Sequence, residues 1–421
     1  MTDFRAAIAA LGDPAMEGAG PALRPGVPTV LQVLPSLVTG GVERGASDMA
    51  RAIEAAGLNA VVMSAGGPMA DALVADGLRH LKAPVASKNP AVMLRNAGRI
   101  ACAAAATGAA VIHARSRAPA WSALIAARRA NLPFVTTFHG TYNFRGRIKR
   151  WYNSVMTRGD RVIAISDFIA GHIAAHYDCP AERVRIIPRG IDAAVFDPAA
   201  VPAERVAALR AQWGVAEDRP VVMLPARLAR WKGHAVLVRA LVRMERDCLC
   251  LMVGGAGHAD YRGEMEGLAA SLGTGPRVRF VGDCRDMPAA YALADVVVSA
   301  STDPEAFGRV AVEAQAMARP VVATAHGASP ETVIDLERDP EGGTGWLVPP
   351  GDAQALAAAL DLALALPAPA RAAIGARGRA NVLARFTRAA MCAATLQVYA
   401  EVSPAVAAAV SHPGGTARPR G

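Results

Sequence analysis

Residues 294–333 read ADVVVSASTDPEAFGRVAVEAQAMARPVVATAHGASPETV, and this stretch decides the fold. The apolar run Val296–Ser301 predicts a buried strand, and the spacing of Phe307–Met317 predicts a helix. A second apolar run, Val321–Ala325, follows Pro320 and predicts another strand. Strand, loop, helix and strand in this order predict a βαβ unit of a parallel sheet.

Two carboxylates, Glu305 and Glu313, stand eight residues apart at the junction of this loop and helix. A helix running through both would separate them by roughly 12 Å, enough to reach different parts of one elongated ligand. The backbone N–H groups of Phe307, Gly308 and Arg309 would lie near the helix N-terminus, which favours a phosphate. An isolated pair of this kind more often has a structural interpretation, with Glu305 as an acid in the first helical turn and Glu313 as a solvated surface acid. The apolar segment around Glu313 argues against that interpretation.

A second candidate site segment follows the predicted strand 220–225. Arg227 and Lys232 lie five residues apart in a loop that precedes the predicted helix 235–243. Two cations in such a loop can clamp a diphosphate, the arginine by a forked contact and the lysine as a point charge. Surface cations are the alternative. Gly255 lies in the sequence GGAG after another predicted strand, but neither a Walker A sequence nor the full dinucleotide-binding fingerprint is present, which argues against a Rossmann dehydrogenase.

The N-terminal half alternates strand and helix patterns, which predicts a doubly wound sheet. Gly40 and Gly41 follow its first predicted strand, 29–34, where glycine lets the backbone approach a ligand. His139 follows the predicted strand 134–138, at the carboxyl edge where open α/β sheets bind ligands. A Gly-Gly turn and a single histidine each also have an ordinary structural interpretation.

Length and composition indicate a two-domain globular protein of 421 residues. The apolar runs are too short to predict a transmembrane helix, and no secretory signal is indicated. The six cysteines are scattered, so neither a disulfide framework nor a zinc site is expected, and a cytoplasmic compartment fits. No Asp-x-Asp sequence is present; neither a metal nor another cofactor is therefore expected.

Positive charge is concentrated in the first half. Residues 1–200 contain 22 Lys and Arg against 14 Asp and Glu, a net of +8 out of the formal +9 of the chain. The densest segment, residues 143–161, includes Arg145, Arg147, Lys149, Arg150 and Trp151. Basic residues interleaved with aromatic ones suit an anionic membrane surface. No nucleic-acid-binding motif accompanies them, so no nucleic-acid partner is expected, and a merely solvated basic helix is the alternative.

Three motifs together resemble glycosyltransferase family 4. They are the E-x7-E sequence from Glu305 to Glu313 followed by ARPVVAT, the R-x4-K-G sequence from Arg227 to Gly233, and the GGVER sequence that begins at Gly40. The resemblance implies an α/β fold of the GT-B type, with two doubly wound Rossmann-like domains facing a central cleft and a C-terminal helix crossing back to the first. The expected segments are a mobile arm (1–26), an N-terminal acceptor-side domain (27–200), a C-terminal nucleotide-sugar domain (201–385), a crossover helix (386–403) and a disordered tail (404–421).

The resemblance also implies roles for the candidate residues. Arg227 and Lys232 would hold the donor diphosphate, Glu313 the ribose, and Glu305 the hydroxyls of the donor sugar, with His139 against the sugar. The resemblance places Gly40 and Gly41 in a loop that faces donor and acceptor. Arg189 stands where many members of the family have Asn. This departure affects the hydrogen bonds expected in the turn of residues 185–192 but not the expected fold.

The implied function is retaining, metal-independent hexosyl transfer. The sugar would pass from a nucleotide-diphospho-sugar to a lipid-linked or polysaccharide acceptor in lipopolysaccharide or exopolysaccharide synthesis, by an enzyme peripheral on the cytoplasmic face of the membrane. A sugar-nucleotide epimerase, a glycogen-type synthase and a protein that only binds nucleotide sugars are the alternatives.

Overall fold

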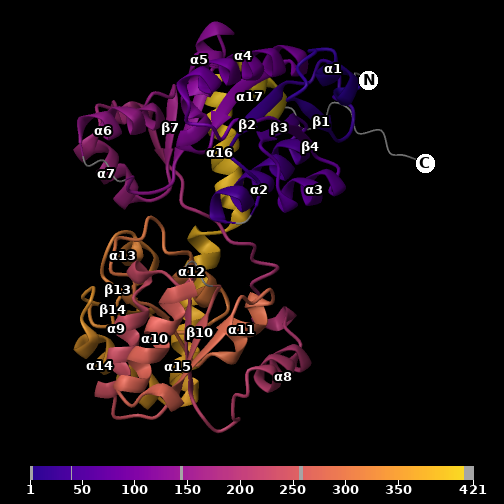
Figure 1. The fold of residues 1–421 in the computed structure, drawn as a ribbon. Coiled ribbons are helices and arrows are strands. Elements are labelled where there is room, and N and C mark those ends of the chain that lie inside the picture. Colours follow the sequence, from indigo (N-terminus) through magenta and orange to yellow (C-terminus); the bar gives the residue numbers. More distant parts are fainter. Residues whose placement is uncertain (1–2, 39, 143–145, 256–258, 412–421) are drawn as a thin grey trace. The chain divides into compact units, whose positions relative to one another are not determined.

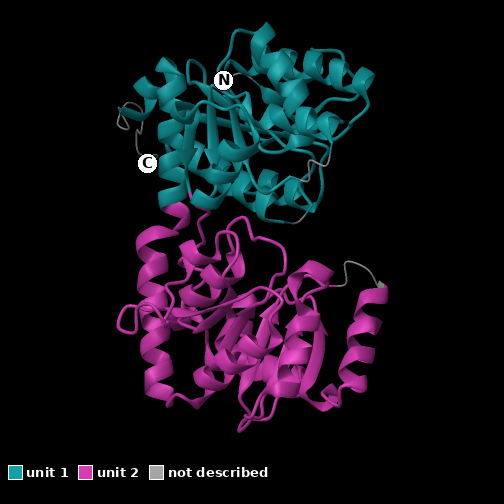
Figure 2. Cartoon of the chain, turned by 90° about the vertical axis from the view of Figure 1, so that its left-hand side faces the viewer, with its two compact units in different colours: residues 1–187, 390–421 teal, residues 188–389 magenta. Residues whose placement is uncertain are grey.

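The computed structural model describes residues 3–38, 40–142, 146–255 and 259–411. The chain divides into two compact units (Figure 2): unit 1 comprises Met1–Ile187 with Ala390–Gly421, and unit 2 comprises Pro188–Ala389. Each unit is a largely parallel sheet with helices on its faces (Figure 1), as predicted.

Unit 1 has a sheet in the order β1-β4-β3-β2-β5-β6-β7-β8, parallel except for β1. Most of its strands are buried on both faces, which explains why they read as continuous apolar runs. The strands are β1 (Glu17–Ala19), β2 (Thr29–Val33), β3 (Asn59–Ser64), β4 (Arg79–Lys82), β5 (Ala109–Ala114), β6 (Phe134–Phe138), β7 (Arg161–Ala164) and β8 (Val184–Ile186). The helices are α1 (Phe4–Ala9), α2 (Gly41–Ala55), α3 (Pro68–Ala75), α4 (Pro90–Thr107), α5 (Arg117–Arg129), α6 (Arg147–Asn153), α7 (Asp167–His176), α16 (Arg388–Val402) and α17 (Pro404–Ser411), with the 3₁₀ turns η1 (Ser154–Thr157) and η2 (Ala181–Arg183).

The sheet of unit 2 has the order β11-β10-β9-β12-β13-β14 and is parallel throughout. Its strands are β9 (Val221–Pro225), β10 (Leu249–Val253), β11 (Val278–Gly282), β12 (Val296–Ser299), β13 (Val321–Thr324) and β14 (Gly345–Val348). Its helices are α8 (Ala203–Gln212), α9 (His234–Arg243), α10 (Ala259–Ser271), α11 (Met287–Leu293), α12 (Arg309–Ala316), α13 (Ser329–Thr332), α14 (Ala353–Ala365) and α15 (Ala368–Arg385), with the 3₁₀ turns η3 (Pro198–Ala200), η4 (Arg230–Lys232) and η5 (Gly275–Arg277).

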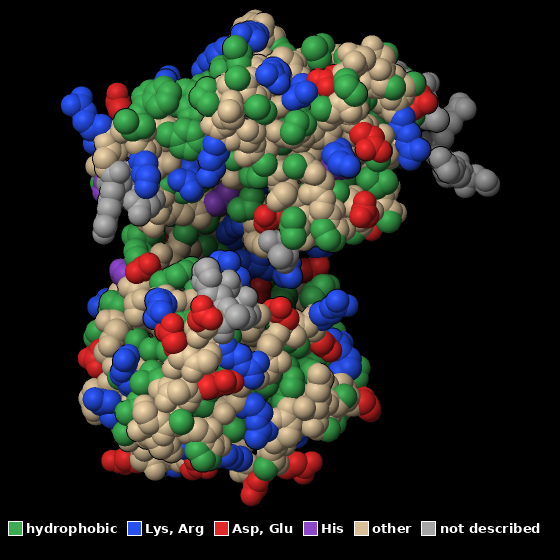
Figure 3. Space-filling model, in the orientation of Figure 1, with side chains coloured by type: hydrophobic (Ala, Val, Ile, Leu, Met, Phe, Trp, Pro, Cys, Tyr) green, Lys and Arg blue, Asp and Glu red, His purple; other side chains and the backbone are tan. Residues whose placement is uncertain are grey.

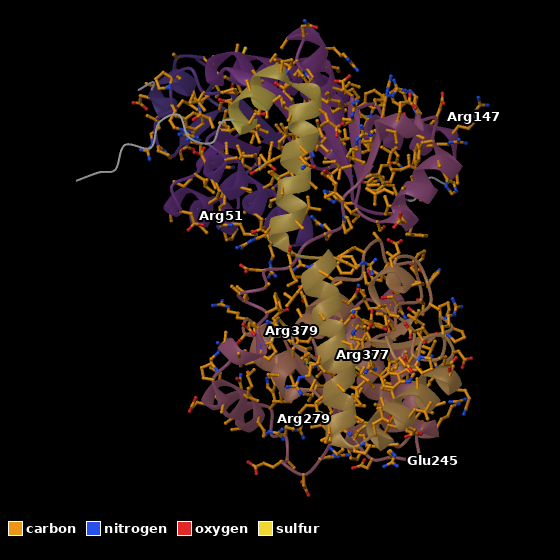
Figure 4. All side chains as sticks on the ribbon, turned by 180° about the vertical axis from the view of Figure 1, so that it is seen from behind. Arg51, Arg147, Glu245, Arg279, Arg377 and Arg379 are labelled. Atoms are coloured by element: carbon orange, nitrogen blue, oxygen red, sulfur yellow. The ribbon has the colours of Figure 1, made fainter. Side chains whose placement is uncertain are left out.

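The boundary between the units lies at 187/188 rather than at the predicted 200/201. Residues 188–200 belong to unit 2 because they pack on its last helix and the residues that follow it. Ile191 pairs with Thr387 in an isolated parallel bridge. Arg379, which extends from α15 (Figure 4), donates to the carbonyl of Phe196 at 3.0 Å and pairs with Asp197 at 2.9 Å.

Two predictions for the chain ends are wrong. The described part of the predicted mobile arm is folded, since α1 buries Phe4 and Ile8 and β1 pairs antiparallel with β4. The first part of the predicted disordered tail is α17, which buries Val406 in the unit 1 core. Residues 412–421 lie outside the described residues. Apolar side chains thus organise the described parts of both ends despite their Ala- and Gly-rich composition.

A buried polar network joins α16 to the unit 1 sheet. Tyr399 on α16 contacts Nδ1 of His113 at 2.7 Å, and Nε2 of the same ring contacts Thr137 Oγ1 at 2.7 Å. Arg115 donates to Gln32 Oε1 at 3.0 Å. Burial raises the pKa of Tyr399 and lowers that of His113, which favours a protonated phenol and a neutral imidazole. The helix that closes unit 1 is therefore held by specific hydrogen bonds as well as by apolar packing.

No single helix in the described ranges is long and apolar enough to cross a membrane. Among the described helices, the pair α14 and α15 reaches that length and composition when taken together, and the two are bent by 113°.

We expect Tyr399→Phe to lower the thermal unfolding midpoint of the protein. The substitution leaves Nδ1 of His113 without its Tyr399 partner, and an unsatisfied buried polar group costs about 1–3 kcal/mol. Tyr152→Phe is the matched control, because the buried Tyr152 hydroxyl has no partner among the described residues. The measurement is differential scanning calorimetry of both variants. Equal unfolding midpoints of Tyr399→Phe and Tyr152→Phe would show that the hydrogen bond to His113 does not stabilise unit 1.

Candidate functional site

The predicted donor-binding residues of unit 2 gather where the order of its sheet reverses. The chain builds β9, β10 and β11 toward one edge and then returns to place β12 on the other side of β9. The loops after β9 and β12 therefore diverge at the carboxyl ends of two adjacent strands, the usual ligand position in open α/β sheets. Lys232 lies in the first loop and Glu305 in the second.

Lys232 and Glu305 form an ion pair across these two loops. The ammonium nitrogen lies 2.5 Å from Oε1 of Glu305, and the side chains are 16% and 14% exposed. Ser301 donates to the same oxygen at 2.6 Å, and the Lys232 ammonium lies 4.0 Å from the centroid of the Trp231 ring. No donor to Oε2 of Glu305 is found in the described ranges. One carboxylate oxygen is thus fixed, while the other is available to a ligand hydroxyl.

Two glycines allow close backbone contacts with the loop after β12, Gly233 from the loop after β9 and Gly327 from the loop after β13. Gly233 has φ 75°, and a Cβ there would lie 1.8 Å from the carbonyl oxygen of Ala300. Gly327, with φ 63°, pairs with Glu305 in a parallel bridge, and a Cβ there would lie 2.4 Å from the Glu305 carbonyl. The glycine of the R-x4-K-G motif is therefore required by backbone contact between the loops.

Arg227 occupies the first loop with its side chain exposed. No hydrogen-bond or ion-pair partner for its guanidinium is found in the part of the chain that the structure describes. Gly255 follows β10, the neighbouring strand, and a Cβ on it would lie 2.4 Å from the Asp283 carboxylate. Arg227 thus offers an unpaired forked donor at the same sheet edge as Lys232.

Helix α12 begins later than the sequence predicted. It starts at Arg309 because Gly308 adopts a left-handed conformation, φ 80°, so Glu305 lies in an extended segment and the separation expected for a continuous helix does not apply. Phe307 is buried against Phe386, with ring centroids 5.6 Å apart. The backbone N–H groups of Phe307, Gly308 and Arg309 have no partner in the described ranges, which leaves them available to an anion.

Glu313 is held by two side chains that the sequence analysis did not assign to it. Arg309 donates to Oε1 at 2.6 Å from its terminal nitrogen, and the Tyr291 hydroxyl donates to Oε2 at 3.0 Å. Burial, followed by the adjacent Glu313 charge, raises the pKa of Tyr291 well above its ordinary value, so the phenol stays a donor. The i,i+4 spacing of Arg309 and Glu313 could have revealed the first contact. Tyr291 comes from α11, and no local pattern pointed to it.

The remaining predicted donor-site residues belong to unit 1. Gly40, with φ 146°, is the N-cap of α2, and Gly41 is the first residue of that helix, after β2. His139 follows β6, and its backbone N–H donates to the Tyr142 hydroxyl at 3.3 Å. These residues lie at the carboxyl edge of the other sheet, as predicted.

The predicted membrane residues that the structure describes lie on α6. Ile148 and Trp151 of this helix are 83% and 58% exposed, and Arg147 points outward from the unit (Figure 4). Lys149 and Arg150 are also exposed. Arg145 lies outside the described residues. The hypothesis of a basic helix with exposed apolar side chains is compatible with this arrangement.

The described residues contain no group of three or more His, Cys, Asp and Glu side chains arranged to hold a metal ion.

Comparison with known proteins identifies relatives for both halves of the chain. The profile of Glycosyltransferase Family 4 matches residues 39–195, and that of Glycosyl transferases group 1 matches residues 206–381. A D-inositol 3-phosphate glycosyltransferase from Xylanimonas cellulosilytica is 32% identical over 318 residues, which span 70% of this chain and 72% of that protein. A GDP-mannose-dependent alpha-(1-6)-phosphatidylinositol monomannoside mannosyltransferase from Mycolicibacterium smegmatis is 34% identical over 231 residues, which span 52% of this chain and 56% of that protein.

Solved structures agree with the fold. A glycosyltransferase from Rickettsia africae superimposes with a TM-score of 0.82 and 35% identity, covering 89% of this chain and 98% of that chain. HepE from Anabaena, solved in complex with UDP-glucose, superimposes with a TM-score of 0.75 and 27% identity over 89% of this chain and 98% of that chain. These solved structures thus share the fold of this chain, including the sheet of unit 2 and the point between β9 and β12 where its strand order reverses.

We expect Gly233→Ala to destabilise unit 2. Left-handed backbone costs a non-glycine residue on the order of 1–2 kcal/mol, and the clash with the Ala300 carbonyl adds to this. The unfolding midpoint should fall by more than roughly 4 °C. Gly263→Ala, in the open interior of α10, is the control and should be neutral or stabilising. An unchanged midpoint in Gly233→Ala would show that the two loops are not packed as described.

Proposed function

The chain belongs to glycosyltransferase family 4, and on this premise we propose that it transfers a hexose with retention of anomeric configuration and without a metal ion. The donor is a nucleotide-diphospho-sugar. The acceptor is a lipid-linked or polysaccharide glycan of the cell envelope, of the lipopolysaccharide or exopolysaccharide kind. The enzyme acts as a peripheral protein on the cytoplasmic face of the membrane.

The observation that carries the donor assignment is the Lys232–Glu305 pair at the switch point of unit 2. It places a cation and a hydrogen-bond acceptor side by side, and the reacting end of a nucleotide sugar needs both. As the glycosidic bond breaks, the diphosphate gains negative charge and the anomeric carbon becomes cationic. Lys232, Arg227 and the N–H groups before α12 would stabilise the departing diphosphate electrostatically. These groups would supply the positive charge that a magnesium ion supplies in metal-dependent transferases.

Each carboxylate has a separate role in this proposal. Oε2 of Glu305, which has no donor in the described ranges, would accept a hydrogen bond from a sugar hydroxyl. Glu313 would bind the ribose hydroxyls, with Arg309 and Tyr291 fixing its orientation. His139 of unit 1 would contact the donor sugar, and Gly40 and Gly41 would line the path of donor and acceptor.

The acceptor assignment draws on charge and on the relatives. The excess of basic residues in the first half of the chain suits a phosphorylated or membrane-borne acceptor. The relatives named above are called after an inositol phosphate and a phosphatidylinositol mannoside, and both of these acceptors carry phosphate. A donor of the UDP class is supported by the HepE complex and a GDP donor by the mannosyltransferase.

Glu305→Gln and Lys232→Ala should each nearly abolish sugar transfer while the protein stays folded. Loss of one preorganised electrostatic contact to the transition state lowers turnover about 10²–10³-fold. Turnover would be measured with UDP-, GDP-, ADP- and TDP-sugars, with and without EDTA, and the unfolding midpoint of each variant would establish folding.

The matched control for these variants is Arg239→Ala, an exposed cation on α9 outside the site, which should retain turnover. Near-wild-type turnover in either site variant would refute the site assignment. Loss of wild-type turnover in EDTA would refute metal-independent transfer. Proton NMR of the product would test retention, since a retained configuration gives an α-linked product from an α-linked donor.

Replacing Arg147, Lys149 and Arg150 together with Ala should release the protein from anionic vesicles at physiological salt. Each basic residue near the headgroups contributes ~1 kcal/mol to binding, so the triple variant should bind roughly 100-fold more weakly or worse. Cosedimentation with vesicles containing phosphatidylglycerol is the measurement. Unchanged cosedimentation would refute the α6 membrane surface.

A further inference from the structure

We propose that a basic pocket beside α6 binds the phosphate of an anionic phospholipid, with the protein docked on a bilayer through Trp151 and Ile148. The proposal rests on the membrane partner of the proposed function, and it assigns a binding site to residues that have no role in sugar transfer. The pocket has a volume of about 450 Å³ and lies on the surface of unit 1.

Three arginines from three separate elements converge on this pocket. Arg128 comes from the last turn of α5, Arg158 follows η1, and Arg183 ends η2. Ser154 and Thr157 line the same hollow, and their hydroxyls donate to the carbonyls of Trp151 at 2.7 Å and Ser154 at 2.9 Å. Forked guanidinium groups are the donors that bind phosphate oxygens there.

These arginines keep most of their donors available. Arg128 contacts Asp160 only at 3.5 Å, and Arg158 uses its Nε toward Ser154 Oγ at 3.4 Å. The side chain of Arg183 has no hydrogen-bond partner in the described ranges. One carboxylate, Asp178, also lines the pocket and has no ion-pair partner in the described ranges, so the three arginines leave the pocket with an excess of positive charge.

An aromatic column connects the pocket with the exposed face of α6. Arg158 lies 5.2 Å from the centroid of the Trp121 ring, and Trp121 stacks on Trp151 with centroids 4.6 Å apart. The indole N–H of Trp121 donates to the carbonyl of Tyr152 at 3.0 Å, which fixes the stack. Trp151 and Ile148 remain largely exposed. Figure 3 shows hydrophobic side chains gathered between α5 and α6, with Lys and Arg side chains around them.

The sequence around the pocket is free of acids over a long range. Residues 77–159 contain 14 Lys and Arg and no Asp or Glu. Arg79 and Arg99 of this segment pair with Glu54 and Asp13 outside it, whereas the exposed cations of α6 favour an anionic partner. Exposed tryptophan and isoleucine beside the cations favour a bilayer over a nucleic acid, since apolar side chains enter the headgroup region while guanidiniums contact phosphate.

The test uses the full chain with vesicles of phosphatidylcholine alone and of phosphatidylcholine mixed with phosphatidylglycerol. The Arg128→Gln/Arg183→Gln variant should bind the anionic vesicles roughly 30-fold more weakly than the wild type. The Arg128→Lys/Arg183→Lys variant keeps the charge but loses both forks, and it should bind with intermediate strength. Arg5→Gln/Arg239→Gln removes the same charge from α1 and α9 and should bind like the wild type.

Several outcomes would overturn the pocket. Wild-type binding by the lysine variant, or equal losses in the glutamine and control variants, would leave only unspecific attraction between charges. Equal competition by inorganic phosphate at the same phosphate concentration, with no gain from the bilayer, would mean a free-anion site. Retention of a nucleic acid in preference to anionic vesicles would also refute the proposal.

The experiment separates failure of the pocket from failure of the proposed function. Donor-induced stabilisation of the pocket variants is measured in parallel and should equal that of the wild type, because none of the altered residues lies in the donor site. Vesicle binding could depend on Arg147, Lys149 and Arg150 but not on Arg128 and Arg183. That result would support the α6 membrane surface and refute the pocket. If neither the wild type nor any variant binds vesicles, both the pocket and the α6 membrane surface are refuted.

Discussion

The ion pair between Lys232 and Glu305 is the interaction on which the candidate site depends. Its partners come from loops that leave adjacent strands in opposite directions, and Gly233 lets those loops touch by packing directly on the Ala300 carbonyl. Both side chains are mostly withdrawn from water, so separating them would leave a poorly solvated charge at considerable cost. The cation and the carboxylate are therefore positioned by folding, before any ligand arrives.

This pairing is compatible with contact between Lys232 and a diphosphate. A lysine ammonium has three donors, and Glu305 takes only one of them. A phosphate oxygen can thus replace solvent at the ammonium without breaking the ion pair. Arg227 differs, because its side chain is exposed and unpaired in the described ranges, so a ligand would have to order it. The two cations of the R-x4-K-G motif would then contribute differently, Lys232 as a fixed charge and Arg227 as an adaptable forked contact.

The sequence predicted features carried by local patterns and missed those made between distant elements. Buried parallel strands such as β9 and β13 were predicted because they read as unbroken apolar runs. The short strands β1 and β4 were missed because one has three residues and the other carries Arg79, His80 and Lys82. The late start of α12 follows from the left-handed Gly308, which a helical pattern hides. Ser301 and Tyr291 could not be linked to their carboxylates, because those contacts depend on loop conformation and on α11.

Charge is arranged differently in the two halves of the chain, and the difference bears on how each would respond to salt. In the candidate donor site each acid has a basic neighbour, as in Lys232–Glu305 and Arg309–Glu313. Over residues 77–159 the cations have no acids of their own segment to offset them. Some of these cations, such as Arg79 and Arg99, pair with acids elsewhere in unit 1, and repulsion among the exposed ones is relieved by an external anion or by dissolved salt. Screening over about 8 Å at physiological ionic strength acts on exposed cations and far less on a largely buried pair. Raising the salt concentration should therefore weaken attachment to an anionic surface while the pairing within the donor site persists.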